Sequence, residues 1–208
     1  MNPLLELYYA PNTIAAAPAI ALYAANLDFK LKKIDFSKHE QGSAAYRALN
    51  PKARVPALGT DRGIITETGA ILHYIAALAP QANLIPQDPF EGAQVASLLH
   101  YFASTMHVNH AHKLRGYRWA TQESSYADMR AKVCETMTAS CQFVERHING
   151  PFIFGGQLTL ADCHLYALYR WLEGDGVDVA AFPKLKAWAE HMQAQRCVQA
   201  VYAAGVLI

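Results

Sequence analysis

The pattern of apolar and polar positions changes character part-way along the chain. Up to about residue 79, short apolar runs alternate with helical patterns, which predicts the order β-α-β-α-β-β-α. The expected strands cover 4–9, 29–36 and the two arms of a hairpin that turns at 61–63. The expected helices cover 15–25, part of 37–49, and a stretch that begins at 66–68. This order favours a mixed sheet with helices on its faces.

From Glu91 onward the pattern is helical throughout. One face of the first long helix carries Val95, Leu98, Leu99, Phe102 and Met106. Further helices are expected over 126–147, 160–172 and 183–195, the first of them ending before the Asn-Gly-Pro stop at 149–151. We therefore predict an α/β domain over residues 1–79 and an all-α domain over 91–208. A linker over 80–90 is expected between them, because this stretch holds three prolines and no periodic pattern.

The stretch from Asn50 to Ala70 carries the candidate binding chemistry. Pro56 lies inside an apolar strand but has no N–H, which predicts a strand end with unpaired backbone groups to which an extended peptide could pair. A helix N-terminus at Thr66-Glu67-Thr68 attracts anions, and Thr68 adds a hydroxyl donor. Glu67 suits an ammonium group, so the two together match the head of an α-amino acid. The alternative is that Thr66 or Thr68 caps the helix and Glu67 favours its dipole.

A second motif, Thr159-Leu-Ala-Asp162, predicts a capping box in which Asp replaces the usual Glu or Gln. A catalytic Asp162 is the alternative. Reciprocal capping accounts for both residues, so a structural role is expected.

Composition and charge exclude several functions. The 208 residues suffice for a sizeable core, and a net charge of +1 without a basic run argues against nucleic acid as a partner. No apolar run approaches the ~18 residues of a membrane span. Residues 1–3 begin no basic region followed by an apolar stretch, so a cytoplasmic protein is expected.

Neither the cysteines nor the clustered histidines indicate a disulfide framework or a metal site. The four cysteines form no Cys-x-x-Cys pair, and Cys134 and Cys141, seven residues apart on one helix, are expected to be small core residues. His107, His110 and His112 lie close in sequence, but His112 points elsewhere and no acid or cysteine stands at a matching offset. No metal is therefore expected.

Three segments in this order and spacing resemble the cytosolic glutathione transferase family, nearest to its bacterial beta class. They are Asn-Pro-Lys-x-x-Val-Pro-Ala-Leu (50–58), Thr-Glu-Thr-Gly-Ala-Ile (66–71) and Gly-Gly-Gln-Leu-Thr-Leu-Ala-Asp (155–162). The resemblance implies a thioredoxin-like first domain, glutathione as a substrate and a homodimer. It also implies that Pro56 is cis, that Val55 pairs with the cysteinyl unit of glutathione, and that Glu67 and Thr68 hold the γ-glutamyl head.

One departure from the family matters most for chemistry. The beta-class cysteine falls on Ile14, which can neither donate to sulfur nor form a mixed disulfide. Tyr9 falls where the tyrosine-type classes keep their catalytic tyrosine, whereas Asn12 and Thr13 lie near the position at which other bacterial members use Thr, Ser or Asn. All three remain candidates to contact the thiol, through side chain or backbone N–H. The alternative is that Tyr9 is a core aromatic and Asn12 a turn former.

The resemblance assigns further positions. His107 matches a histidine near the thiol, but the lysine that follows it in the beta class is Val108 here, so weak conjugation is expected. Lys38 and Lys52 match cations for the glycine carboxylate of glutathione, and Arg54 could add a contact. Contacts to the partner subunit's glutathione fall on His100 and Ser104. The second-substrate pocket is expected to be lined by Pro11, His110, Tyr117, Trp119 and Tyr166.

The expected function is that of a glutathione transferase-like enzyme, in which the glutathione thiolate attacks a hydrophobic electrophile. Two alternatives stay open. One is a glutathione-binding protein with little conjugating activity, acting as a ligand carrier or regulatory partner. The other is a glutathione-dependent disulfide reductase or peroxidase, which needs no protein cysteine.

Overall fold

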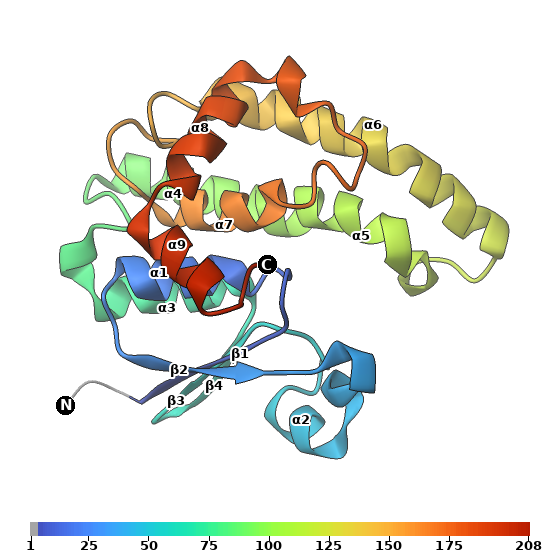
Figure 1. The fold of residues 1–208 in the computed structure, drawn as a ribbon, viewed down its shortest axis with the longest axis horizontal. Coiled ribbons are helices and arrows are strands. Elements are labelled where there is room, and N and C mark those ends of the chain that lie inside the picture. Colours follow the sequence, from blue (N-terminus) through green and yellow to red (C-terminus); the bar gives the residue numbers. More distant parts are fainter. Residues whose placement is uncertain (1–3) are drawn as a thin grey trace.

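A four-stranded sheet and a layer of helices make up the computed structural model, which describes residues 4–208 (Figure 1). The strands are β1 (Leu5–Tyr9), β2 (Phe29–Lys33), β3 (Ala57–Thr60) and β4 (Gly63–Thr66), in the spatial order β2-β1-β3-β4. β1 runs parallel to β2 and antiparallel to β3. The expected mixed sheet is therefore confirmed, and the fold is a thioredoxin-like domain followed by a helical domain.

Helices α1 (Ala16–Ala24) and α3 (Thr68–Leu78) lie between the sheet and the helical domain (Figure 1). α1 is rich in alanine and almost completely buried, so neighbouring backbones can approach it closely. It packs against α3, against α7 (Leu160–Tyr169) and against α9 (Arg196–Ala203). The first turn of α1 is thereby held between the two domains.

One strand of the first domain is shorter than the sequence pattern predicted. The strand expected over 29–36 ends at Lys33, because Asp35 turns the chain by accepting a hydrogen bond from Ser37 N at 2.9 Å. The segment after it forms short 3₁₀ turns at Phe36–Lys38 and Glu40–Gly42 and the helix α2 (Ala44–Leu49), as the polar stretch predicted. The hairpin is confirmed, with Gly63 at φ +131° where only glycine is unstrained.

The second domain is built from α4 (Pro89–Tyr101), α5 (His107–Arg115), α6 (Glu123–His147), α7, α8 (Pro183–Gln193) and α9. A π-helical segment, Phe102–Met106, joins α4 to α5, so the two form one long interrupted helix. All five apolar positions predicted for its inner face are buried. α9 begins just after residue 195, where the last of the predicted helices ends. No helix within residues 4–208 combines the length and apolarity needed to cross a membrane.

The expectation for Cys134 is wrong. Cys141 is buried, but Cys134 is exposed and its Sγ donates to Gly176 O at 3.1 Å. The buried stripe of α6 passes through Val133 and Met137, so Cys134 lies one position around the helix from it. All four cysteines of the chain are free thiols.

The capping box at the start of α7 is confirmed. Asp162 is fully buried, and its Oδ2 accepts from the backbone N and the hydroxyl of Thr159, both at 2.8 Å. Its Oδ1 accepts from Ile153 N at 2.8 Å and from Trp188 Nε1 at 2.9 Å. One carboxylate thus joins α7, α8 and the preceding loop, which is a structural role.

Candidate functional site

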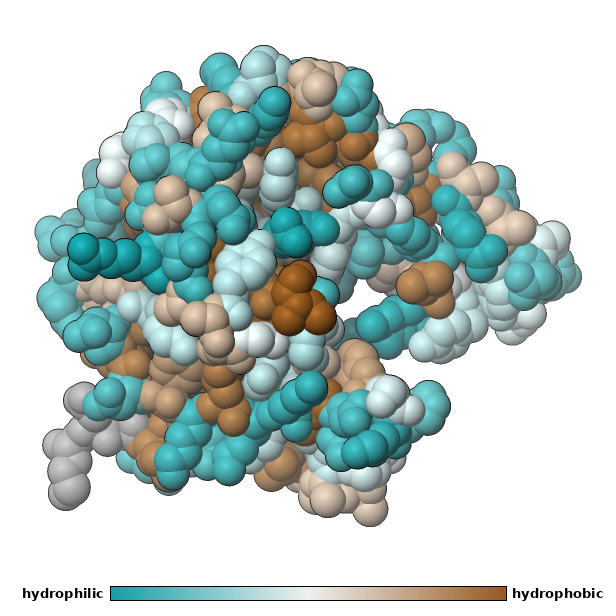
Figure 2. Space-filling model, viewed as in Figure 1, coloured by the Kyte–Doolittle hydropathy of each residue, from teal (hydrophilic) through white to brown (hydrophobic). Residues whose placement is uncertain are grey.

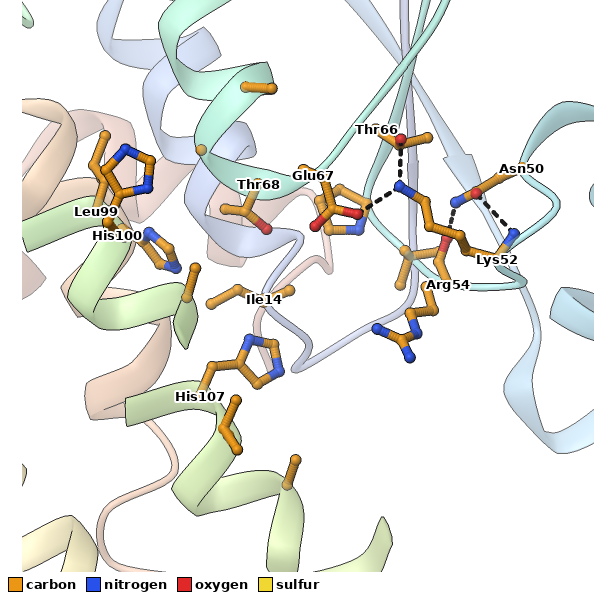
Figure 3. A pocket seen from close by; sticks show the side chains of 18 of the residues that line it. Ile14, Asn50, Lys52, Arg54, Thr66, Glu67, Thr68, Leu99, His100 and His107 are labelled. Carbon is orange, nitrogen blue, oxygen red and sulfur yellow. Dashed lines mark hydrogen bonds and ion pairs between the residues drawn. The ribbon is translucent and has the colours of Figure 1, made fainter. Parts of the chain in front are cut away.

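The N-terminus of α3 opens into a cavity of 580 Å³ between the two domains, here called the α3-side cavity (Figure 3). Thr68, Gly69 and Ala70 line it, and N–H groups in the first turn of a helix have no intrahelical acceptor. The positive end of the α3 dipole adds to them. The predicted anion-attracting end therefore faces a cavity large enough for a small peptide.

Glu67 stands at this helix end in an unusual backbone conformation. It is the N-cap of α3 with φ +75°, a region that non-glycine residues seldom adopt, and its side chain is mostly exposed. Its carboxylate pairs with Lys52 Nζ, which also donates to Thr66 Oγ1 at 2.7 Å (Figure 3). Lys52 was expected at the opposite end of the ligand, but here it lies beside Glu67.

The backbone beside cis-Pro56 is unpaired, as predicted. The Val55-Pro56 peptide bond is cis, and Pro56 is buried while Val55 lines the cavity. Within residues 4–208 neither the N–H nor the C=O of Val55 has a backbone partner. An extended peptide can therefore form two hydrogen bonds there.

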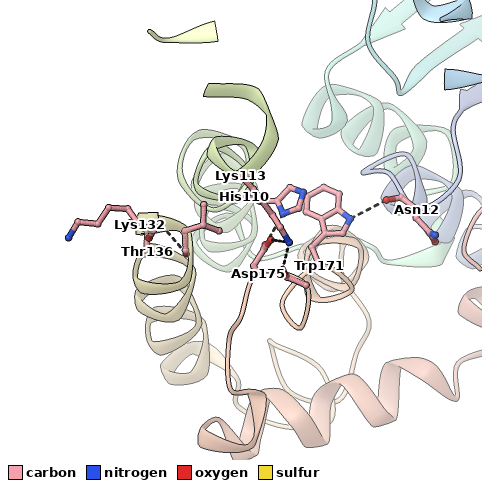
Figure 4. Close-up of polar contacts among 9 residues, drawn as sticks. Asn12, His110, Lys113, Lys132, Thr136, Trp171 and Asp175 are labelled. Carbon is pink, nitrogen blue, oxygen red and sulfur yellow. Dashed lines mark hydrogen bonds and ion pairs between the residues drawn. The ribbon is translucent and has the colours of Figure 1, made fainter. Parts of the chain in front are cut away.

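Asn12 is committed to other contacts. Its carbonyl accepts from Trp171 Nε1 at 3.1 Å (Figure 4). Its N–H donates to Val206 O at 3.0 Å, and its Oδ1 accepts from Ile208 N at 3.1 Å. Its φ of +56° suits asparagine. Asn12 thus fixes the loop before α1 to the C-terminal segment.

The residues after Asn12 keep their backbone donors. In the described part of the chain neither Thr13 N–H nor Ile14 N–H has an acceptor, and both residues precede the first turn of α1. The Thr13 hydroxyl donates to Ala10 O at 2.7 Å. Tyr9 is only 7% exposed and lines neither of the two cavities described here. The backbone N–H groups of Thr13 and Ile14 are therefore available to a ligand in the adjoining cavities.

A second cavity of 600 Å³, here called the α2-side cavity, adjoins the first and is lined from both domains. Ile14, Lys52, Arg54, Val55 and His107 line both cavities, so they form one continuous cleft. Figure 2 shows the cleft as a hollow between the helical layer and α2, on the right of the view. Ile14 lines both cavities, and Figure 3 shows it between Thr68 and His107.

Comparison with known proteins decides the family. The glutathione S-transferase N-terminal domain matches residues 3–77, and the glutathione S-transferase C-terminal domain matches residues 97–196. This chain belongs to the glutathione S-transferase family.

Several relatives of this transferase homologue match over nearly its whole length. The crystal structure of a glutathione transferase homologue from Sulfitobacter, with bound glutathione, is 49% identical, covers 100% of both chains and has a TM-score of 0.96. A beta-class glutathione S-transferase from Sphingomonas chungbukensis is 25% identical, with a TM-score of 0.82 over 98% of this chain and 100% of that one. Glutathione S-transferase GstA of Escherichia coli O157:H7 is 26% identical over 94% of this chain and 96% of its own.

The transferase homologue keeps an uncharged histidine beside the cleft. Burial is the main reason that the pKa of His107 falls to about 4, and the positive charges of Arg115, Arg118 and Arg54 add to the effect. His107 follows the π-helical segment directly, and such segments often shape functional sites. At neutral pH it is therefore a neutral hydrogen-bonding group, not a cation for a thiolate.

The residues expected around a second substrate are divided between several places. His110 and Tyr117 line the α2-side cavity and Trp119 lines the α3-side cavity. Pro11 lines neither of them. The expectation for Tyr166 is wrong: it is 1% exposed, and its hydroxyl bonds to Gln193 within the helical core.

Three other expected contacts lie at or beyond the edge of the cleft. Lys38 is exposed, pairs with Asp35 at 3.6 Å and lines neither cavity. His100 is exposed and lines the α3-side cavity of its own chain (Figure 3), while the hydroxyl of Ser104 donates to His100 O at 2.8 Å. Within residues 4–208, His, Cys, Asp and Glu side chains form no group of three that could hold a metal.

Sequence reasoning missed several residues of the cleft. His164 lines the α3-side cavity although it is fully buried, and neither ring nitrogen has a hydrogen-bond partner among the described residues. Arg115 and Arg118 line the α2-side cavity. A histidine inside an apolar helix was a usable signal, whereas nothing in the local pattern placed the two arginines opposite Arg54.

Proposed function

We propose that this transferase homologue binds glutathione in the α3-side cavity and promotes attack of the thiolate on an electrophile. The observation that carries the proposal is that two features suited to glutathione line the same cavity. The α3 N-terminus with Glu67 suits the γ-glutamyl head, and the unpaired backbone of Val55 suits the next peptide unit. Ile14, just before α1, lines both this cavity and the α2-side cavity.

The proposed thiolate site uses main-chain donors. An ordinary thiol has a pKa near ~8.5, so only a small fraction is ionised at neutral pH. The free N–H groups of Thr13 and Ile14 at the positive end of α1 favour the thiolate form. The proton passes to solvent. The thiolate sulfur then forms a bond to the electrophilic carbon, and the leaving group departs from that carbon with the electrons of its bond.

The two cations near Val55 have different roles in this proposal. Lys52 is held by Glu67 and Thr66, so it positions the Glu67 carboxylate for the ammonium group. Arg54 extends away from that pair (Figure 3) and lines the α2-side cavity. Arg54 is therefore the proposed partner of the glycine carboxylate, with Lys38 as an outer contact.

Glutathione should raise the melting temperature of the wild-type protein in proportion to the logarithm of its concentration, because a ligand of the native state stabilises it by mass action. Glu67→Gln removes the charge that faces the ammonium group and should weaken binding by about tenfold, a loss of ~1.4 kcal/mol. Differential scanning fluorimetry measures both.

Asp61→Asn is the matched control, since Asp61 is an exposed carboxylate at the tip of the nearby hairpin. Its titration curve should overlay the wild type. The binding proposal fails if glutathione leaves the melting temperature of the wild-type protein unchanged at millimolar concentration.

Ile14→Cys should restore a thiol beside the bound sulfur. With oxidised glutathione this variant should form a mixed disulfide at residue 14 at least about tenfold faster than Ala45→Cys, an exposed thiol outside both cavities. Peptide mass spectrometry locates the adduct and separates it from any at Cys134. A slower reaction at residue 14 would place the sulfur of glutathione elsewhere.

The carrier alternative is favoured by one observation, the neutral His107 followed by Val108 instead of a cation. Ultraviolet absorption of bound glutathione against pH separates the two functions. A thiol pKa below that of free glutathione supports the enzyme, and an unchanged value supports the carrier.

A homodimer in the cytoplasm completes the proposal, and four unpaired thiols suit that reducing compartment.

A further inference from the structure

The α2-side cavity has an unbalanced charge. Five cationic side chains line it, and no Asp or Glu of the described chain does. They approach from two sides: Lys52, Arg54 and Arg47 from the α2 region, and Arg115 and Arg118 from the end of α5. Loops and helices of both domains therefore converge on a site that attracts anions.

The arginines at its centre have no acidic partner. Within residues 4–208 the guanidinium groups of Arg54, Arg115 and Arg118 form no ion pair, whereas nearby Lys113 is paired with Asp175 at 3.3 Å. Arg115 is half-buried, and burial lowers its pKa, with Arg118 and Arg54 adding to the effect. Arg54 and Arg118 are exposed, so the half-buried Arg115 gains most from an anion bound beside it.

The rest of the cavity wall can accept an apolar or aromatic body. Trp171 lines it and stacks on His110 at a ring separation of 4.1 Å and an interplanar angle of 18° (Figure 4). His110 is held in place by Asp175, whose carboxylate lies 2.7 Å from Nδ1. Ile14, Leu114 and Tyr117 add apolar surface. A ring lying on this surface would extend toward the arginines.

The α2-side cavity has more cations than the single glycine carboxylate of glutathione can pair with. The proposed glutathione position brings one glycine carboxylate toward Arg54, on the side of the first domain. Arg115 and Arg118 belong to the helical domain and have no acidic partner. Arg115 lines only the α2-side cavity, whereas Arg118 lies where the two cavities join and lines both. Since Ile14 lines both cavities, an acceptor held by these two arginines lies beside the proposed thiolate.

We propose that the second substrate of this transferase homologue is an acidic electrophile, an aromatic or apolar body with a carboxylate that Arg115 and Arg118 bind. This inference rests on the proposed function and makes its substrate class specific. Guanidinium groups bind carboxylates with paired, charge-assisted hydrogen bonds, which supply both affinity and orientation.

The test uses two preformed conjugates, so it requires no turnover. They are S-(4-carboxy-2,6-dinitrophenyl)glutathione and its methyl ester, which differ by a single negative charge. Isothermal titration calorimetry should show the acid binding at least about tenfold more tightly than the ester to the wild-type protein. Raising the salt concentration should reduce this ratio, because screening weakens the ionic contact.

Arg115→Gln and Arg118→Gln should each weaken binding of the acid by about fivefold to tenfold and change binding of the ester by less than about twofold. Arg62→Gln, in the exposed hairpin, is the matched control and should change neither. Arg115→Lys should recover part of the loss, because it keeps the charge without the planar fork.

Two results would overturn the inference. Equal affinity of the wild-type protein for acid and ester is the first, and it depends on no variant. The second is an equal loss of affinity for acid, ester and free glutathione in the arginine variants, which would assign these cations to the glycine carboxylate. Failure of the wild-type protein to bind free glutathione would instead remove the proposed function itself.

Discussion

Asp162→Ala should lower the free energy of unfolding by about 4 kcal/mol or more. The carboxylate accepts four hydrogen bonds, from Thr159 N, Thr159 Oγ1, Ile153 N and Trp188 Nε1. Removing it leaves buried donors without an acceptor, at about 1–3 kcal/mol each. For a chain of this size the melting temperature should fall by roughly 10–15 °C.

Asp88→Ala is the matched control for that prediction. Asp88 also caps a helix, accepting from Phe90 N and Glu91 N at 3.0 Å, but it is exposed. Loss of an ordinary cap costs about 1 kcal/mol. Glutathione affinity of the folded fraction should be unchanged in both variants. A large loss of affinity in Asp162→Ala at full stability would show that the residue serves the site and not the fold.

The second large effect is expected on acidification. The pKa of His107 is lowered to about 4 and that of His164 to about 3, in both cases mainly by burial. The unfolded chain binds these two protons near pH 6.5, whereas the native protein does not. Stability is therefore complete above pH 6.5 and falls as the pH drops toward 4. Two protons give a slope of about 2.7 kcal/mol per pH unit.

His164→Phe isolates one of the two contributions. Phenylalanine keeps the edge contact with Phe102, whose ring centroid lies 5.4 Å away, and no hydrogen bond is lost because both ring nitrogens of His164 lack a partner. The variant should be at least as stable as the wild type at pH 7.5 and should show about half its slope between pH 5 and 6.5. Urea titrations at several pH values measure this.

His147→Gln is the control for the acid slope, because His147 is exposed. Its stability should follow the wild-type curve at each pH. A His164→Phe protein that keeps the full slope would show that His164 is already protonated in the native state or that other groups dominate the linkage.

The proposed thiolate chemistry requires no protein cysteine at residue 14. Ile14 is 5% exposed and lies where both cavities meet, so an apolar side chain occupies the position from which a thiol would act. The backbone there still presents the N–H groups of Thr13 and Ile14. Chemistry that depends on main-chain donors survives this substitution, whereas chemistry through a protein disulfide does not.

Local pattern determined most of the fold and part of the site. The periodicity of 95–106, the hairpin around Gly63 and the Thr159–Asp162 box depend on interactions between near neighbours in the chain, which the sequence displays directly. Val55, Pro56, Glu67 and Thr68 line the α3-side cavity together, and one continuous stretch of sequence contains them all.

Tertiary structure alone decided the rest. Asn12 looked free to meet a thiol, but its contacts come from Trp171 and Ile208, more than 150 residues away in sequence. Tyr166 was expected in the second-substrate pocket, but its hydroxyl contacts side chains of α8 and α9 in the helical domain. Arg54 and Arg115 meet only because the two domains close over one cleft. Packing between distant segments decides which side chains are buried and which charged groups lie together. Contacts between distant residues leave no pattern in the local sequence.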